Sequence, residues 1–144
     1  MSHPLEAAFR ATCYRILLDD DWIETRIDRP SPRLARWLAE HACPIASLVS
    51  ARNPQGRALD DVGNRERERT LRAELAGRGL IGLPAEGTAG DWREPSLFVP
   101  GLGGEACRAL MQAFDQLAWV EYDAAGLARL RWTRDPDSQE QTCR

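Results

Sequence analysis

The residues best suited to chemistry in this sequence are an arginine, a glutamate and three side-chain amides. Arg67 carries a planar guanidinium, which binds carboxylate or phosphate groups through two parallel hydrogen bonds. Amides add further donors and acceptors, and a tryptophan supplies an apolar wall. The functional hypothesis is one pocket, with Arg67 holding an anionic group and Trp92 as the wall, formed by Asn53, Asn64, Arg67, Trp92, Glu94 and Gln116.

A structural role explains the same residues, and the sequence leaves both roles open. Asn53 precedes Pro54, which restricts its backbone to extended conformations, and its amide can bond the backbone of the following turn. An inward-facing Arg67 needs a carboxylate, for which Glu94 is our candidate. Such an ion pair fixes the segment around Trp92 on the helix that carries Arg67, without any ligand.

Sets of catalytic or metal-binding residues are few. Glu94 and Ser96 have the types of a base and a nucleophile, but residues two apart in a strand merely share a face. His41 and Cys43 lack the second pair of ligands that a zinc site needs. The glycine-rich segment 101–104 lacks the third glycine of a dinucleotide-binding turn and the lysine of a P-loop. We therefore expect no metal and no cofactor.

Charge and composition narrow the class of partner. The 144 residues include 19 basic and 22 acidic side chains, a net charge of −3, and every basic one is an arginine. No overall basic field holds a nucleic acid, so the composition argues against that partner. No apolar run approaches the roughly 18 residues of a membrane span, and scattered cysteines fit reduced thiols. We expect a cytoplasmic protein without membrane contact.

Hydrophobic periodicity predicts a hairpin near each end of the chain, with helices and short strands between them. Strand-forming runs cover residues 14–18, 22–28, 45–50, 80–83, 96–99, 119–122 and 127–132. Helical patterns begin at the caps Ser31 and Asp60 and at Glu105, and end before Pro44, near Gly77 and at Leu117. Residues 84–91 are rich in turn formers and predict a loop.

This order of elements predicts an α+β fold. We expect a single domain over residues 1–132, with a mixed, mostly antiparallel sheet and three packed helices. The alternative is an α/β sandwich with a doubly wound parallel sheet, which requires a more regular alternation of strands and helices. Residues 133–144 are polar and predict a disordered C-terminal tail.

Short motifs in a fixed order resemble a known family. They are Ser50-Ala-Arg-Asn-Pro54, then Leu59, Asn64, Arg67 and Leu71-Arg-Ala-Glu-Leu75, then Gly87 and Asp91-Trp92-Arg-Glu94-Pro-Ser96, and Ala113-Phe114-Asp-Gln116. Across residues 14–122 this succession resembles the bacterial family named domain of unknown function 3293. The resemblance implies no activity, cofactor or catalytic residue. It implies that the polar positions belong to a recurring pattern.

Two classes of function fit these features. We favour a non-catalytic binding or interaction module, whose partner is a small anionic ligand or another protein. The alternative is a small enzyme that acts on an anionic substrate. The enzyme requires an ionisable group with a strongly shifted pKa in the same pocket, whereas the binding module does not.

Overall fold

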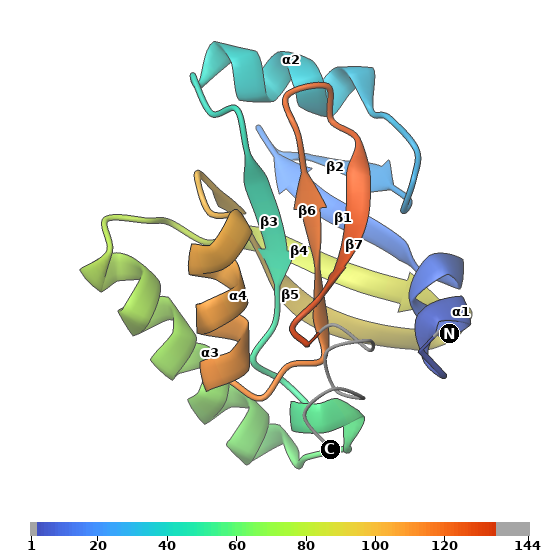
Figure 1. Cartoon of the computed structure of the whole chain (residues 1–144), viewed down its shortest axis with the longest axis vertical. Coiled ribbons are helices and arrows are strands. Elements are labelled where there is room, and N and C mark those ends of the chain that lie inside the picture. The colour runs from blue at the N-terminus through green and yellow to red at the C-terminus, as the bar shows by residue number, and fades with distance from the viewer. Residues whose placement is uncertain (1–2, 135–144) are drawn as a thin grey trace, which may run out of the picture.

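A computed structural model of the chain describes residues 3–134, which form a seven-stranded sheet (Figure 1). The strands lie in the order β2-β1-β4-β5-β3-β6-β7, and the six pairings between neighbours are all antiparallel. Their bounds are β1 (Cys13–Leu18), β2 (Asp21–Thr25), β3 (Ala46–Val49), β4 (Leu83–Ala89), β5 (Trp92–Pro100), β6 (Ala118–Tyr122) and β7 (Ala128–Trp132).

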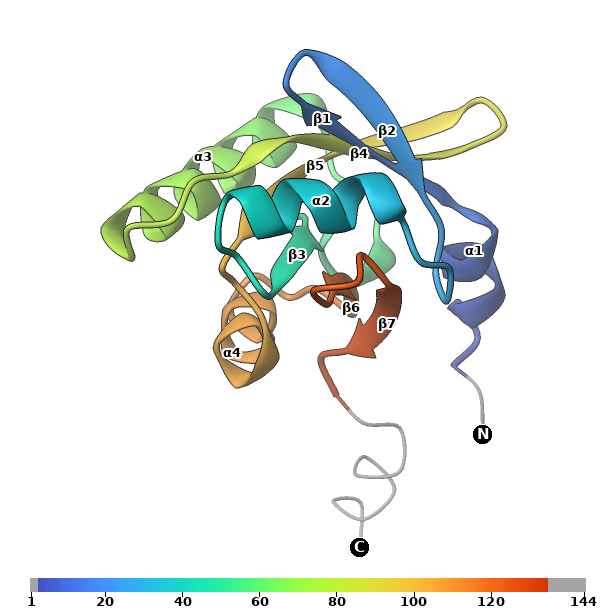
Figure 2. The same ribbon diagram turned by 90° about the horizontal axis from the view of Figure 1, so that it is seen from above.

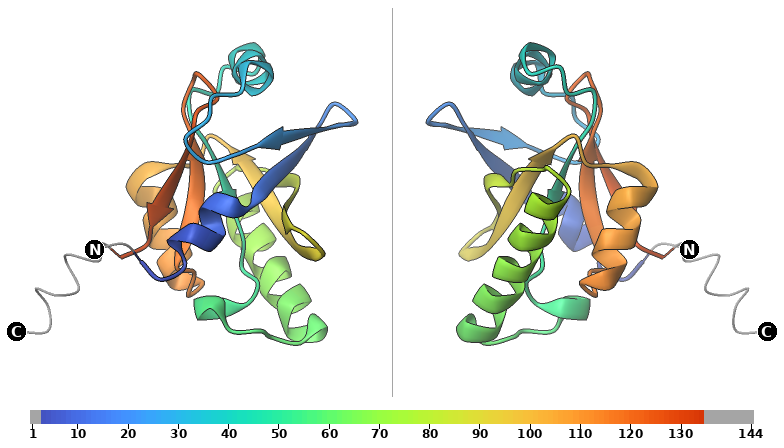
Figure 3. Two further views of the ribbon diagram at one scale, coloured as in Figure 1. Left: turned by 90° about the vertical axis from the view of Figure 1, so that its right-hand side faces the viewer. Right: turned by 90° about the vertical axis from the view of Figure 1, so that its left-hand side faces the viewer.

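The sheet is strongly curled, so that its first and last strands in space approach each other at one end (Figure 3). Asp28, just after β2, donates its backbone N–H to the carbonyl of Ala128 in β7 over 2.7 Å. Inside the curl, the Tyr122 hydroxyl lies 2.7 Å from Oγ1 of Thr25 and joins β6 to β2. At this end of the molecule a backbone hydrogen bond therefore links the segment after β2, one outermost strand of the sheet, to β7, the other, as in a nearly closed barrel.

The inner face of the curled sheet packs against α2 (Pro32–Glu40). Ser31 caps this helix, since its side chain accepts a 3.2 Å hydrogen bond from the backbone N–H of Leu34. Leu34 and Leu38 are fully buried against the sheet, as the helical stripe predicted. Each such burial stabilises the fold by about 1.5–3 kcal/mol.

Two helices, α3 (Asp61–Gly77) and α4 (Gly104–Ala113), pack against the outer face. Asp60 caps α3 by accepting a 2.8 Å hydrogen bond from the backbone N–H of Gly63. Leu71, on the buried stripe of α3, joins side chains from β3, β5 and α4 in a second core. Figure 2 shows α2 and α3 on opposite sides of β4 and β5, so the sheet separates the two cores.

A fourth helix, α1 (Glu6–Ala11), and a short 3-10 turn, η1 (Pro54–Gly56), were not part of the prediction of three helices. Phe9 of α1 packs edge-on against Trp132 of β7, with the ring centroids 5.6 Å apart. No residue of α1 is fully buried, so no apolar stripe marks this helix in the sequence.

The prediction of a loop over residues 84–91 is wrong. Those residues belong mostly to β4, which forms a hairpin with β5 through the two-residue turn Gly90–Asp91. β4 is paired on both sides, and these backbone hydrogen bonds override its low intrinsic strand propensity. Pro84 lies before the residues that pair with β1, where its missing N–H is not required. The strand predicted over 80–83 meets β4 only at Leu83.

The α+β class is confirmed, while the doubly wound alternative is wrong because that fold needs parallel strands. Between residues 3 and 134 the sheet also lacks the parallel pair that a mixed sheet contains. Thr133 is buried and donates its hydroxyl to the carbonyl of Leu117 over 2.9 Å. Residues 135–144 of the expected tail lie outside the described residues.

None of the helices between residues 3 and 134 combines the length and the apolar character needed to cross a bilayer.

We predict that Gly126→Ala destabilises the fold by roughly 2–5 kcal/mol. Gly126 has a φ of +72°, and an added Cβ lies 2.3 Å from the carbonyl oxygen of Ser31, at the start of α2. Gly90→Ala is the matched control, because its φ is +59° and no atom lies within 4 Å. We expect the control to lose about 1–2 kcal/mol in chemical denaturation. Equal losses contradict the close contact between the β6–β7 turn and α2.

Candidate functional site

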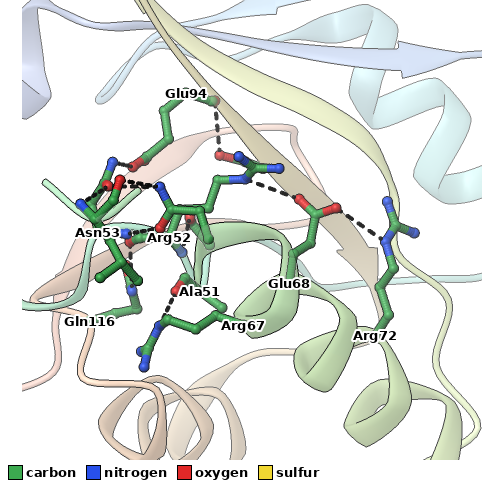
Figure 4. Close-up of polar contacts among 12 residues, drawn as sticks. Ala51, Arg52, Asn53, Arg67, Glu68, Arg72, Glu94 and Gln116 are labelled. Carbon is green, nitrogen blue, oxygen red and sulfur yellow. Dashed lines mark hydrogen bonds and ion pairs between the residues drawn. The ribbon is translucent and has the colours of Figure 1, made fainter. Parts of the chain in front are cut away.

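The polar cluster is organised around Asn53, between β3 and α3 (Figure 4). Its backbone is left-handed, with φ 48° and ψ 62°, so the extended conformation predicted from the following proline is wrong. Asparagine tolerates this conformation, and three side-chain hydrogen bonds hold it here. Oδ1 accepts from the backbone N–H of Leu59 and from Nδ2 of Asn64, each at 3.0 Å. Nδ2 donates to Oε1 of Glu94 over 3.0 Å.

Asn64, in the first turn of α3, is 6% exposed and bonds reciprocally with Asn53. Its Oδ1 accepts the backbone N–H of Asn53 at 2.9 Å, and its Nδ2 also donates to the carbonyl of Leu59 at 3.2 Å. A buried amide needs such partners, because an unpaired polar group costs about 1–3 kcal/mol. The two asparagines therefore link the β3–α3 connection to α3.

Glu94 lies in β5 with its side chain on the inner face, since it pairs with Gly87, which in turn pairs with Tyr14 of the inner core. The carboxyl group is half-buried. Burial raises its pKa above the usual value of 4.5, against the opposing effects of the Asn53 hydrogen bond and the charge of Arg52. Arg52 itself pairs with Glu68 of α3, Nε to Oε1, over 3.3 Å.

The ion pair predicted between Arg67 and Glu94 is wrong. Arg67 donates from Nε to the carbonyl of Ala51 over 2.6 Å and from Nη2 to the carbonyl of Phe114. The reason is that α3 packs on the outer face of the sheet, whereas Glu94 faces the inner core. For the part of the chain that is described, no carboxylate lies within ion-pair distance of Arg67.

Gln116 follows α4 and hydrogen-bonds to the β3–α3 connection. Its Nε2 donates to the carbonyl of Arg52 over 3.0 Å, and the backbone N–H of Gln55 donates to the carbonyl of Asp115 over 2.7 Å. Asn53, Asn64 and Glu94 thus contact one another directly. Arg67 and Gln116 reach the same segment through backbone carbonyls, so the cluster assembles without the predicted ion pair.

An open groove of about 700 Å³ lies between α3 and α4. Its apolar part is formed by Leu59, Leu110, Ala113 and Phe114. Four charged residues also line it, of which Arg78 pairs with Glu74 over 3.2 Å, while the others are Arg67 and Glu66. Of the six predicted site residues, Arg67 alone appears in the groove lining.

Trp92 lies away from this groove, at the beginning of β5, and is 49% exposed. It shares the inner face with Glu94, two residues further along the strand. The predicted residues are therefore distributed over two surfaces. Arg67 faces the groove between α3 and α4, whereas Trp92 and Glu94 face the inner side of the sheet. The three amides, of Asn53, Asn64 and Gln116, lie at the β3–α3 connection between these two surfaces.

The other candidates have structural partners. Ser96 is buried, and its hydroxyl donates to the carbonyl of Glu94 over 3.4 Å. His41 stacks on Trp37 with ring centroids 3.8 Å apart. At the glycine-rich turn, the backbone N–H of Gly104 donates to Glu121 over 2.7 Å. Within residues 3–134, no group of three metal-ligating side chains comes together.

Sequence reasoning missed the groove and the backbone acceptors of Arg67. Every residue has a carbonyl, so the identities of Ala51 and Phe114 carry no signal for this role. The one sequence signal for the groove is a pair of exposed small residues on one face of α4, Ala109 and Ala113, which are four residues apart.

Fold and site together define a single-domain α+β protein with a curled antiparallel sheet and a polar cluster at the β3–α3 connection. The model of the family described as "Protein of unknown function (DUF3293)" matches residues 49–119, and this match supports membership of the chain in that family. The matched region is shorter than the expected 14–122 but contains all six predicted site residues. Neither a curated protein nor a solved structure matches the chain significantly.

We predict that Asn53→Ala lowers the free energy of unfolding by about 3–5 kcal/mol, since it removes three hydrogen bonds and places alanine in a left-handed conformation. Asn53→Gly is the control, because glycine adopts this conformation freely. We expect the glycine variant to recover about 1 kcal/mol of the loss in urea denaturation. A glycine variant as stable as wild type contradicts the role of the hydrogen bonds.

The raised pKa of Glu94 predicts a pH-dependent stability. A carboxyl whose pKa is higher in the folded state stabilises the fold below its unfolded pKa, and this contribution is lost as pH rises through the folded pKa. Compared with wild type, Glu94→Gln should therefore gain stability as the pH rises above the usual carboxyl pKa of 4.5. Denaturation curves across this range measure the difference. A carboxyl signal of Glu94 that titrates below 4.5 in NMR contradicts the burial effect.

Proposed function

We propose that the protein is a non-catalytic binding module, and that the groove between α3 and α4 binds a small amphipathic anion. Arg67 is the group that receives the carboxylate or phosphate of the ligand. One observation carries the proposal: in the groove, Arg67 has a guanidinium edge that is not engaged by protein.

The two donated hydrogen bonds of Arg67 leave its Nη1 without a described partner. Nη1 is also not among the described side-chain atoms that are buried and unsatisfied, so it remains accessible to solvent. The two carbonyls fix the orientation of the guanidinium before any ligand arrives. A fixed donor binds an oxyanion at a smaller entropic cost than a mobile arginine does.

The rest of the groove supports a ligand with an apolar body. Leu110 and Phe114 supply apolar surface, and the volume of about 700 Å³ lies in the usual range of small-molecule sites. Glu74 and Arg78, which both line the groove, form an ion pair and so neutralise each other's charge. The other charged residues of the lining are Glu66 and Arg67, so the preference for an anion comes from the oriented guanidinium of Arg67 and not from the net charge of the groove.

We favour binding over catalysis because Glu94, the carboxyl group with a raised pKa, does not line the groove. General acid–base catalysis needs such a group within hydrogen-bond reach of the bound substrate. A cytoplasmic location, inferred from the scattered cysteines, is part of this proposal. Cys13, Cys43 and Cys107 are free thiols.

The proposal predicts that hexanoate and hexyl phosphate bind the protein more tightly than hexanamide, their neutral analogue. Ala109→Trp fills the groove from α4 and should weaken binding of both anions by roughly tenfold or more. Ala106→Trp is the matched control, because Ala106 is exposed on the same helix outside the groove lining. Affinities are measured by isothermal titration calorimetry, with backbone NMR shifts locating the site.

Arg67→Lys, with its thermal midpoint measured in parallel, tests the guanidinium. It retains the charge but loses the planar fork, so we expect weaker binding in a protein that remains folded. Equal affinities for hexanoate and hexanamide contradict the proposal. So does binding that persists in Ala109→Trp.

A further inference from the structure

The inner face of the sheet carries a second group of side chains that the groove does not use. Tyr14, Gly87 and Glu94 are direct neighbours across β1, β4 and β5. Trp92 lies on the same face, since a Cβ added to Gly87 meets Cζ3 of Trp92 and Cε1 of Tyr14, each at 3.6 Å. The two rings therefore flank Gly87, whose partner in β5 is Glu94, and the charge of Glu94 acts on Tyr14. Figure 1 shows α1 near this end of β4 and β5.

One oxygen of the Glu94 carboxyl is held in place and the other is free. Oε1 accepts the hydrogen bond from Asn53, whose own conformation is fixed by Leu59 and Asn64. Within residues 3–134 no hydrogen bond reaches Oε2, and this atom is not among the buried unsatisfied atoms. Oε2 is therefore an oriented acceptor that solvent, or a ligand, can reach.

Trp92 offers an aromatic face beside this acceptor. Its side chain is 49% exposed although it belongs to a strand that is buried from Ser96 to Val99. A carboxylate next to an exposed indole favours an organic cation, which gains a charge-assisted hydrogen bond and a cation–π contact together.

We propose that Glu94 and Trp92 form a binding site for an ammonium or guanidinium group, separate from the groove at Arg67. The cation donates a hydrogen bond to Oε2 of Glu94 and lies against the indole of Trp92. This inference does not rest on the anion site, because the two sites lie on opposite faces of the sheet and prefer opposite charges.

The neighbouring groups leave the acceptor available. Tyr14 directs its hydroxyl to the carbonyl of Phe9 over 3.1 Å. Arg52, the cation whose charge acts on Glu94, is paired with Glu68. Arg93, the next residue on β5, pairs with Glu86 over 2.9 Å on the opposite face. Among the described residues no arginine forms an ion pair with Glu94.

Titration with butylguanidinium and with its neutral analogue butylurea tests the site. The readout is the indole N–H signal of Trp92 in NMR, assigned by its disappearance in Trp92→Phe. We expect butylguanidinium to shift this signal with saturation and butylurea to leave it in place. Glu94→Gln keeps an acceptor for Asn53 but removes the charge, and should weaken binding about tenfold.

Glu40→Gln is the matched control, since Glu40 is an exposed carboxylate at the end of α2 and should leave the affinity unchanged. Ala109→Trp should also leave it unchanged, which distinguishes this site from the groove. If Glu94→Gln does not fold, Trp92→Ala replaces it, because Trp92 is half exposed. In that variant the backbone amide signal of Glu94 replaces the indole signal as the readout of affinity. Equal responses to the two probes overturn the proposal, as does an affinity that survives both Glu94→Gln and Trp92→Ala.

Discussion

The arrangement of the polar cluster depends on the left-handed backbone of Asn53. For a side chain other than glycine this conformation is unfavourable, by roughly 1–2 kcal/mol, unless local hydrogen bonds offset the cost. Here the asparagine amide bonds Leu59, Asn64 and Glu94, and thereby connects β3, α3 and β5. The resulting turn directs the carbonyls of the β3–α3 connection outward, where the side chains of α3 and of the segment after α4 bind them. A single backbone conformation thus sets the positions of groups from four elements.

Much of the fold follows from the sequence because its elements carry strong local signals. The caps Ser31 and Asp60, and the buried stripes of α2 and α3, lie where periodicity placed them. The strand β4 was missed because its Pro84 and Gly87 are turn formers, and its stability comes from two neighbouring strands that are distant in sequence. The same limit applies to the site. Residue types indicated that Asn53, Asn64 and Glu94 belong together, but the sequence does not show that the sheet separates Arg67 from Glu94.

This separation changes how the cluster relates to ligands. The sequence left two arrangements open, a pocket in which Arg67 holds an anion and an ion pair in which Arg67 and Glu94 neutralise each other. In the structure each of the two charges is oriented by neutral groups, Arg67 by two carbonyls and Glu94 by one amide. Neutral partners fix a charged group without cancelling its charge, so the attraction for an external ion is retained. The amides between the two charges hold the chain in the conformation that keeps them apart.

The contact between the segment after β2 and the beginning of β7 also affects the association of one molecule of this protein with another. A sheet margin with unpaired N–H and C=O groups recruits strands from other chains, which is a common route to aggregation. At the beginning of β7, Ala128 accepts a backbone hydrogen bond from Asp28 and donates one to Arg29. At the end of β7, Phe9 packs against Trp132. Both ends of this margin are therefore occupied by the protein's own segments. A strand from another chain therefore meets occupied backbone at the beginning of β7 and a packed side chain at its end, which hinders strand addition at this margin.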